Sequence, residues 1–175
     1  MLNPTIQDAL NQQINLEFSS SYAYLAMAAY FESTHLTGFA SWMRVQSQEE
    51  NIHAMKLFDH MHDRGGRAAL QSIPQPKLDF TSPLEAFESA LHNEQKVTAA
   101  INNLYDLASK ANDHATQVML QWFINEQVEE EKNAGQTVDR LKLAGDSAAA
   151  LLILDQQLGN RPPAASVAGP EGGAG

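Results

Sequence analysis

Residues 46–53 read QSQEENIH and place Glu50 and His53 three positions apart in a segment without glycine or proline. On an α-helix this spacing puts both side chains on one face. Continuing outward from the stretch, Met43 and Leu57 extend the same face at spacings of three to four residues. The stretch therefore predicts a long helix whose buried face is interrupted by a carboxylate and an imidazole.

Three further segments carry the same helical period, and turn residues separate them. Asn3-Pro4 and Ser82-Pro83 each offer an N-cap residue followed by proline, whereas Gly65-Gly66 ends the segment quoted above. Residues 65–82 contain two prolines and no helical period, so we expect a long crossover there. The prediction is an all-α fold: a four-helix bundle with one long crossover and a short fifth C-terminal helix. The expected helices cover residues 4–32, 38–63, 83–111, 114–143 and 147–158.

Composition narrows the class of function. The chain has 175 residues, no cysteine and a formal net charge of -10. The lack of cysteine excludes disulfides, zinc ribbons, iron–sulfur clusters and thiol catalysis, and the acidic balance without a Lys/Arg cluster argues against nucleic-acid binding. No apolar run approaches the roughly 20 residues of a membrane span, and the polar N-terminal segment does not read as a signal peptide. We expect a cytoplasmic protein that binds neither nucleic acid nor membrane.

On each of the four long predicted helices, the apolar residues that recur with the helical period form a stripe along one face. Near the middle of each stripe stand polar residues that can bind a metal. In chain order these are Glu17, Glu50, His53, Glu94, Gln127 and Glu130. Glu50 follows Glu17 by 33 positions, and Gln127 follows Glu94 by the same interval. This repeat predicts a bundle with pseudo-two-fold symmetry and a polar site on its axis.

Four carboxylates at one level of a bundle core need a compensating charge. A single glutamate on such a stripe is most simply interpreted as a residue at the rim of the core. Burying an unpaired carboxylate, however, costs free energy. No Lys or Arg lies near these four glutamates on the stripes to pair with them. Carboxylates with an imidazole suit Fe(II), Mn(II) or Zn(II). Helix-bundle di-iron proteins use one Glu from each of two helices and Glu-x-x-His from each of the others. The sequence matches three of these elements, and Gln127-x-x-Glu130 replaces the fourth.

These motifs give the chain a resemblance to the prokaryotic non-haem ferritins that covers residues 1–158. Its specific marks are Asn15-Leu16-Glu17, Gln48-Glu49-Glu50 with His53, Leu120-Gln121-Trp122, residues 126–132 and Leu143-Ala144-Gly145. The resemblance implies one ferritin-like domain over residues 1–158. We interpret residues 159–175, which are rich in Pro, Ala and Gly, as a disordered tail.

The same resemblance implies a function. It indicates an iron-storage subunit with ferroxidase activity, which oxidises Fe(II) with dioxygen or hydrogen peroxide. The ferric product would be deposited as an oxyhydroxide mineral inside a homo-oligomeric cage of twenty-four subunits.

Residue roles also follow from the resemblance. One iron would be held at the positions of Glu17, Glu50 and His53. The second would be held at Glu50, Glu94 and Glu130, so that Glu50 bridges the two irons. Gln127 matches a glutamine that hydrogen-bonds near the oxygen-binding position. Tyr24 matches a tyrosine that donates an electron during oxygen reduction, and the alternative for Tyr24 is aromatic core packing.

A third, inner iron site is implied near Glu130 at Glu49, Glu126 and Glu129. Gln46 stands where some relatives have a histidine ligand, and the alternative for this region is a solvated acidic strip. Bacterioferritins share the bundle but bind haem through a methionine at the position of Asn51, so no haem is expected.

Three alternative functions remain open. The first is a peroxidase or oxygenase on the same bundle. The lack of cysteine argues against a rubrerythrin-like peroxidase, and the lack of a second Glu-x-x-His argues against an oxygenase. The second is a non-catalytic cage component, which would not need a complete set of metal ligands. The third is a miniferritin that protects DNA, which would lack the fifth helix.

Overall fold

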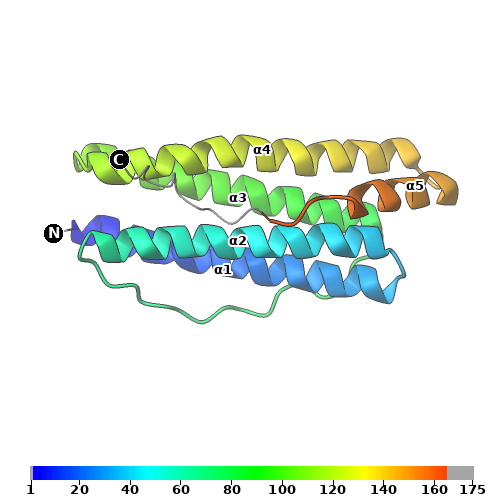
Figure 1. The fold of residues 1–175 in the computed structure, drawn as a ribbon, viewed down its shortest axis with the longest axis horizontal. Helices are drawn as coiled ribbons and strands as arrows, with labels where there is room; N and C mark the ends of the chain where they lie inside the picture. The colour runs from blue at the N-terminus through cyan, green and yellow to red at the C-terminus, as the bar shows by residue number, and fades with distance from the viewer. Residues whose placement is uncertain (1, 165–175) are drawn as a thin grey trace, which may run out of the picture.

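The computed structural model of the chain describes residues 2–164 and contains five helices in that range. These are α1 (Pro4–Ser33), α2 (Thr37–Asp63), α3 (Pro83–Lys110), α4 (His114–Ala144) and α5 (Ala148–Gly159). The first four form an elongated bundle in which α1 packs beside α2 and α3 beside α4 (Figure 1). The predicted all-α bundle with a fifth helix is confirmed. The disorder predicted for the tail falls, over residues 165–175, outside the described residues.

Side-chain caps explain where four of the helices begin. One residue before each of them accepts a hydrogen bond from a backbone N–H of the first turn, which satisfies a donor that the helix itself leaves free. The capping residues are Asn3, Ser82, Asp113 and Ser147. No side chain of its own segment caps α2. Instead, Asp155 of α5 accepts a hydrogen bond of 2.8 Å from the Phe39 N–H.

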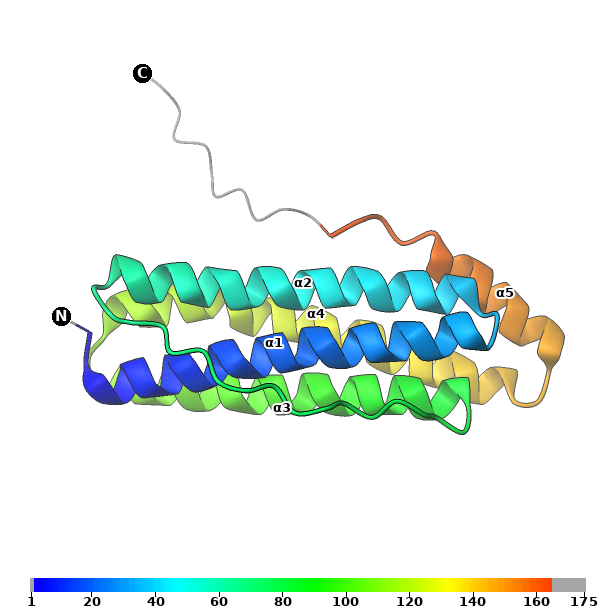
Figure 2. The same ribbon diagram turned by 90° about the horizontal axis from the view of Figure 1, so that it is seen from below.

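The crossover between α2 and α3 runs along the outside of the bundle. It passes over α1 and α3 from one end of the molecule to the other (Figure 2), so α2 and α3 point in the same direction. Asn11 of α1 holds its first part, donating to the Arg67 carbonyl at 3.3 Å and accepting from the Ala69 N–H at 2.7 Å. Among the described residues, no helix has the length and apolar character to cross a membrane.

The bundle core consists of two hydrophobic clusters rather than one. The cluster at the α5 end contains Phe31, Phe39, Met43, Phe87 and Leu141 among others. The cluster at the opposite end contains Leu10, Ile14, Leu57, Ile101 and Phe123 among others. On each of the four bundle helices the residues predicted to interrupt the apolar stripe lie between the two clusters, so the polar layer is enclosed by apolar packing on both sides.

Helix α5 packs against the start of α2 through very close backbone contacts. A Cβ added to Gly38 would lie 1.8 Å from the carbonyl oxygen of Asp155, and one added to Gly159 would lie 2.9 Å from the Gly38 Cα. The opposite side of α5 leaves Leu152 and Ile153 59% and 56% exposed. The helix is therefore fixed to the bundle on one face and exposes two large apolar side chains elsewhere on its surface.

Replacing Gly38 with alanine tests this docking. The new methyl group would overlap the α5 backbone, so we expect a loss of about 1–3 kcal/mol from overpacking and a lower midpoint of thermal unfolding. Gly135→Ala is the matched control, because a Cβ there meets nothing within 4 Å. It should be stabilising by about 0.5–1 kcal/mol through helix propensity. Equal midpoints for the two variants would contradict the close contact.

Candidate metal centre

The structure gathers the predicted site residues into one layer across the middle of the bundle. The four helices of the bundle each contribute at least one side chain, and all are buried. They are Glu17 of α1, Glu50 and His53 of α2, Glu94 of α3, and Gln127 and Glu130 of α4. The polar interruptions of the apolar stripes are therefore interior groups and not rim residues.

Glu17, Glu50 and His53 form one group of potential metal ligands in this layer. One ligand atom from each lies within 4.8 Å of the others, and the His53 Nδ1 is 3.8 Å from the Glu50 Oε2. Three buried atoms of this group, Glu17 Oε2, Glu50 Oε2 and His53 Nδ1, have no hydrogen-bond partner. Buried polar atoms are rarely left unpaired, so their convergence indicates a cation site.

Neutral side chains donate hydrogen bonds to two of the carboxylates. Gln13 donates from its Nε2 to the Glu17 Oε1 at 2.7 Å. The Tyr24 hydroxyl donates to Glu94, and the Gln127 Nε2 donates to the Glu94 Oε2 at 3.3 Å. These donors orient the carboxylates without neutralising their charge.

Gln46 links two of the carboxylates. Its Nε2 donates to the Glu130 Oε2 at 2.8 Å and to the Glu50 Oε1 at 3.2 Å. A second group of potential ligands lies on this side, because His53, Glu126 and Glu130 also bring one ligand atom each within 4.8 Å of the others. Glu126 therefore lies close to His53 and Glu130 of the buried layer.

The other two residues of the predicted third site are placed differently. Glu49 forms an ion pair with Arg161, a residue that follows α5. Glu129 is exposed and belongs to neither group of potential ligands in the described part of the chain. The third site as a set therefore remains a prediction.

Burial dominates the electrostatics of the centre. It raises the pKa of Glu17 to about 7 and that of Glu130 to about 8. It also raises the pKa of Glu50 well above its ordinary value, and the negative charges of Glu94 and Glu17 raise it further. Each carboxyl can therefore hold a proton near neutral pH when no cation is present.

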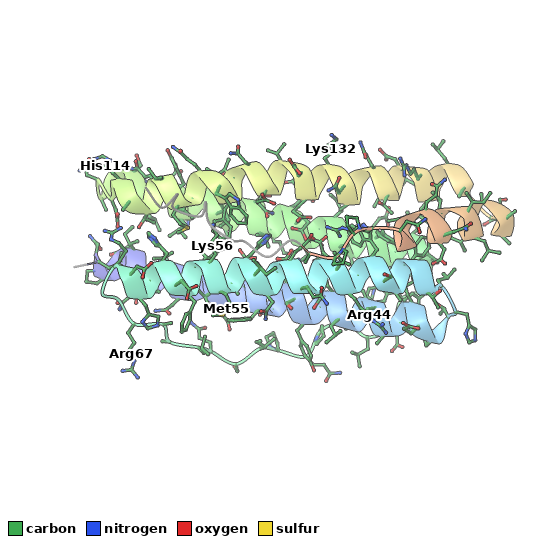
Figure 3. All side chains as sticks on the ribbon, in the orientation of Figure 1. Arg44, Met55, Lys56, Arg67, His114 and Lys132 are labelled. Atoms are coloured by element: carbon green, nitrogen blue, oxygen red, sulfur yellow. The ribbon has the colours of Figure 1, made fainter. Side chains whose placement is uncertain are left out.

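Desolvation acts in the opposite direction on His53. Burial, assisted by the positive charge of Lys56, lowers the pKa of the imidazole to about 4. The ring packs edge-on against Trp122 with centroids 5.4 Å apart, and the Lys56 Nζ lies 4.3 Å from the Trp122 ring centroid. Lys56 lies on α2 (Figure 3). His53 is thus a neutral imidazole, which is the form that binds metal ions.

Gln13 and Arg161 are among the residues around the centre that were not predicted from the sequence as site residues. Gln13 lies four positions before Glu17 on the same helix face, a spacing that signals a side-chain pair. Arg161 had no such signal, because it stands alone in a segment whose composition indicates a disordered tail.

Comparison with known proteins agrees with this geometry. The family model of the ferritin-like domain matches residues 7–144. A bacterial non-heme ferritin from Staphylococcus saprophyticus is 44% identical over 161 residues, which cover 92% of this chain and 96% of that protein. One from Staphylococcus aureus strain USA300 is 39% identical, with 92% and 97% covered.

Solved structures give the same result. The open-pore ferritin of Archaeoglobus fulgidus superposes with a TM-score of 0.91 at 46% identity, covering 93% of this chain and all 100% of that one. A humanized archaeal ferritin gives 0.93 at 47% identity, covering 94% and 100%. The resemblance inferred from the motifs is therefore confirmed. The chain belongs to the ferritin family and is an iron-storage ferritin subunit.

Proposed function

We propose that this subunit oxidises Fe(II) at the buried layer of carboxylates. Glu17, Glu50 and His53 would bind one iron, and Glu50, Glu94 and Glu130 the second, with Glu50 between them. The observation that carries the proposal is the convergence of three unpartnered ligand atoms in the first group. Two Fe(II) ions also balance the charge of four ionised carboxylates.

The reaction is a redox conversion of iron as substrate. Each Fe(II) gives up one electron, and the two electrons together reduce dioxygen to hydrogen peroxide or hydrogen peroxide to water. The carboxylates favour the product because they stabilise the additional positive charge of Fe(III). The ferric ions then hydrolyse, release protons and enter an oxyhydroxide mineral.

Proton release accompanies metal binding in this proposal. Glu17 and Glu130 hold protons near neutral pH because burial raises the pKa of both groups. Bound Fe(II) replaces those protons, since metal ligands must be deprotonated. His53 needs no such exchange because its pKa is already low.

Tyr24 and Gln127 act on the side of Glu94. Gln127 orients the Glu94 carboxylate through the hydrogen bond from its Nε2. Burial raises the pKa of Tyr24 well above its ordinary value, so the phenol stays protonated. Its hydroxyl group donates a hydrogen bond to Glu94. Tyr24 would serve as an electron donor in place of one Fe(II), so that two electrons still reach the oxygen, and its phenol proton would pass to Glu94.

Assembly is the second part of the proposal. A homo-oligomeric cage of twenty-four subunits would enclose the mineral and cover the exposed Leu152 and Ile153 of α5. A cage subunit without catalysis is the alternative function. It would not need the buried, unpaired ligand atoms, which favours the catalytic reading.

Glu50→Gln tests the catalytic part. The substitution keeps the size of the side chain and removes the charge shared by both irons. We expect the initial rate of Fe(II) oxidation, followed by stopped-flow absorbance at two Fe(II) per subunit in aerated buffer, to fall by at least about tenfold.

Glu88→Gln is the control for that experiment, because Glu88 is an exposed glutamate of α3 paired with Lys142 at the surface. It should oxidise iron at the wild-type rate, and both variants should form the same oligomer in size-exclusion chromatography. Wild-type oxidation no faster than in protein-free buffer would rule out the ferroxidase function and leave the storage shell.

Glu130→Gln tests the buried protons. The pKa of Glu130 is about 8 in the metal-free folded protein, and an unfolded glutamate ionises near its ordinary value. Between these limits the unfolded state binds fewer protons, so wild-type stability is reduced progressively as pH rises from about 5 to about 8. The variant avoids this loss. The difference between its thermal midpoint and that of the wild type, both metal-free, should therefore increase with pH, and a constant difference would contradict the raised pKa.

A further inference from the structure

Arg161 reaches the centre from outside the four-helix bundle. It lies two residues after the end of α5 at Gly159, and the close contact of Gly159 with Gly38 fixes that end against the first turn of α2. From there the arginine side chain extends along α2 and is largely buried, with 18% of its surface exposed. The docking of α5 therefore determines where this side chain lies.

The guanidinium contacts three residues of α2 that lie on one helix face. Its Nη1 donates to the Gln46 Oε1 at 2.7 Å, and its Nη2 pairs with the Glu49 carboxylate. Its central carbon lies 4.9 Å from the Trp42 ring centroid, a cation–π distance. Two hydrogen bonds and an aromatic face together hold the charge in one place.

Arg161 fixes the orientation of the Gln46 amide. A guanidinium donates hydrogen bonds and accepts none, so it requires the amide oxygen of Gln46 on its own side. The amide nitrogen then faces the centre, where it donates to Glu130 and Glu50. A continuous chain of hydrogen bonds thus joins Arg161 to two of the proposed iron ligands.

Arg161 also supplies positive charge where the acidic groups are concentrated. The guanidinium pairs directly with Glu49 and is linked to Glu130 through the Gln46 amide, so its positive charge lies beside these two carboxylates. The guanidinium occupies one of the two oxygen atoms of the Glu49 carboxylate, and its positive charge repels a metal ion that would bind the other. Arg161 and such an ion therefore compete for the same carboxylate.

We propose that Arg161 is a built-in cation of the metal centre, which limits the site to two metal ions by occupying Glu49 and positions Gln46 against Glu50 and Glu130. This inference rests on the proposed two-iron centre. It assigns the residue after α5 a role in metal stoichiometry.

Calorimetric titration of the metal-free assembled protein with Zn²⁺ tests the proposal without redox chemistry. Arg161→Gln should bind one more Zn²⁺ per subunit than the wild type, because Glu49 becomes free to act as a ligand beside Glu126. Adding Glu49→Gln to that variant should remove the additional ion. A chain that ends at Asn160 should bind the same additional ion as Arg161→Gln.

Arg140→Gln is the matched control, since Arg140 is an exposed arginine that lines the same surface pocket as Arg161. It should bind the wild-type number of ions. Equal stoichiometry and affinity in the wild type and Arg161→Gln, or an additional ion that persists without Glu49, would overturn the role of Arg161. A wild type that binds no Zn²⁺ tightly would instead overturn the two-metal centre itself.

Discussion

Four carboxylates buried at one level of a bundle core, without a cation on the surrounding apolar stripes, are the constraint on which this structure depends. Burial of such groups is costly unless charge is compensated, and here it raises the pKa of Glu17, Glu50 and Glu130. Two apolar clusters of the long helices, one on each side, enclose this layer. The packing of the bundle thus holds together a layer of carboxylates whose charge the proposed metal ions would compensate.

The side chains that neighbour the carboxylates orient them by hydrogen bonds but do not neutralise their negative charge. Gln13, Gln46, Gln127 and Tyr24 are neutral donors, and each bonds one or two carboxylate oxygens. A lysine or arginine in these places would form an ion pair and compete with the metal. Arg161 is the exception: it forms an ion pair with Glu49 at the edge of the centre, and hydrogen bonds connect it to Glu130 only through Gln46.

The fold and the layer of ligands were predictable because both depend on local patterns. Helical period, caps and glycine breaks define the helices, and the interrupted stripes on the four long helices identify the six residues from Glu17 to Glu130 as one set. Contacts that join distant segments were not predictable in this way. The pairing of Arg161 with Glu49 requires the close approach of Gly38 and Gly159, and no periodicity in residues 159–164 indicates it. The family resemblance grouped Glu129 with Glu126 in a third iron site, yet only Glu126 belongs to a group of potential ligands at the centre.

Anomalous diffraction at the iron edge, from crystals soaked in Fe(II) without oxygen, tests the central claim most directly. If the buried carboxylates are the ligands, two iron peaks per subunit will appear in the layer, one among Glu17, Glu50 and His53 and the other among Glu50, Glu94 and Glu130. Iron peaks confined to the surface or to the pores between subunits, with the layer empty, would contradict it.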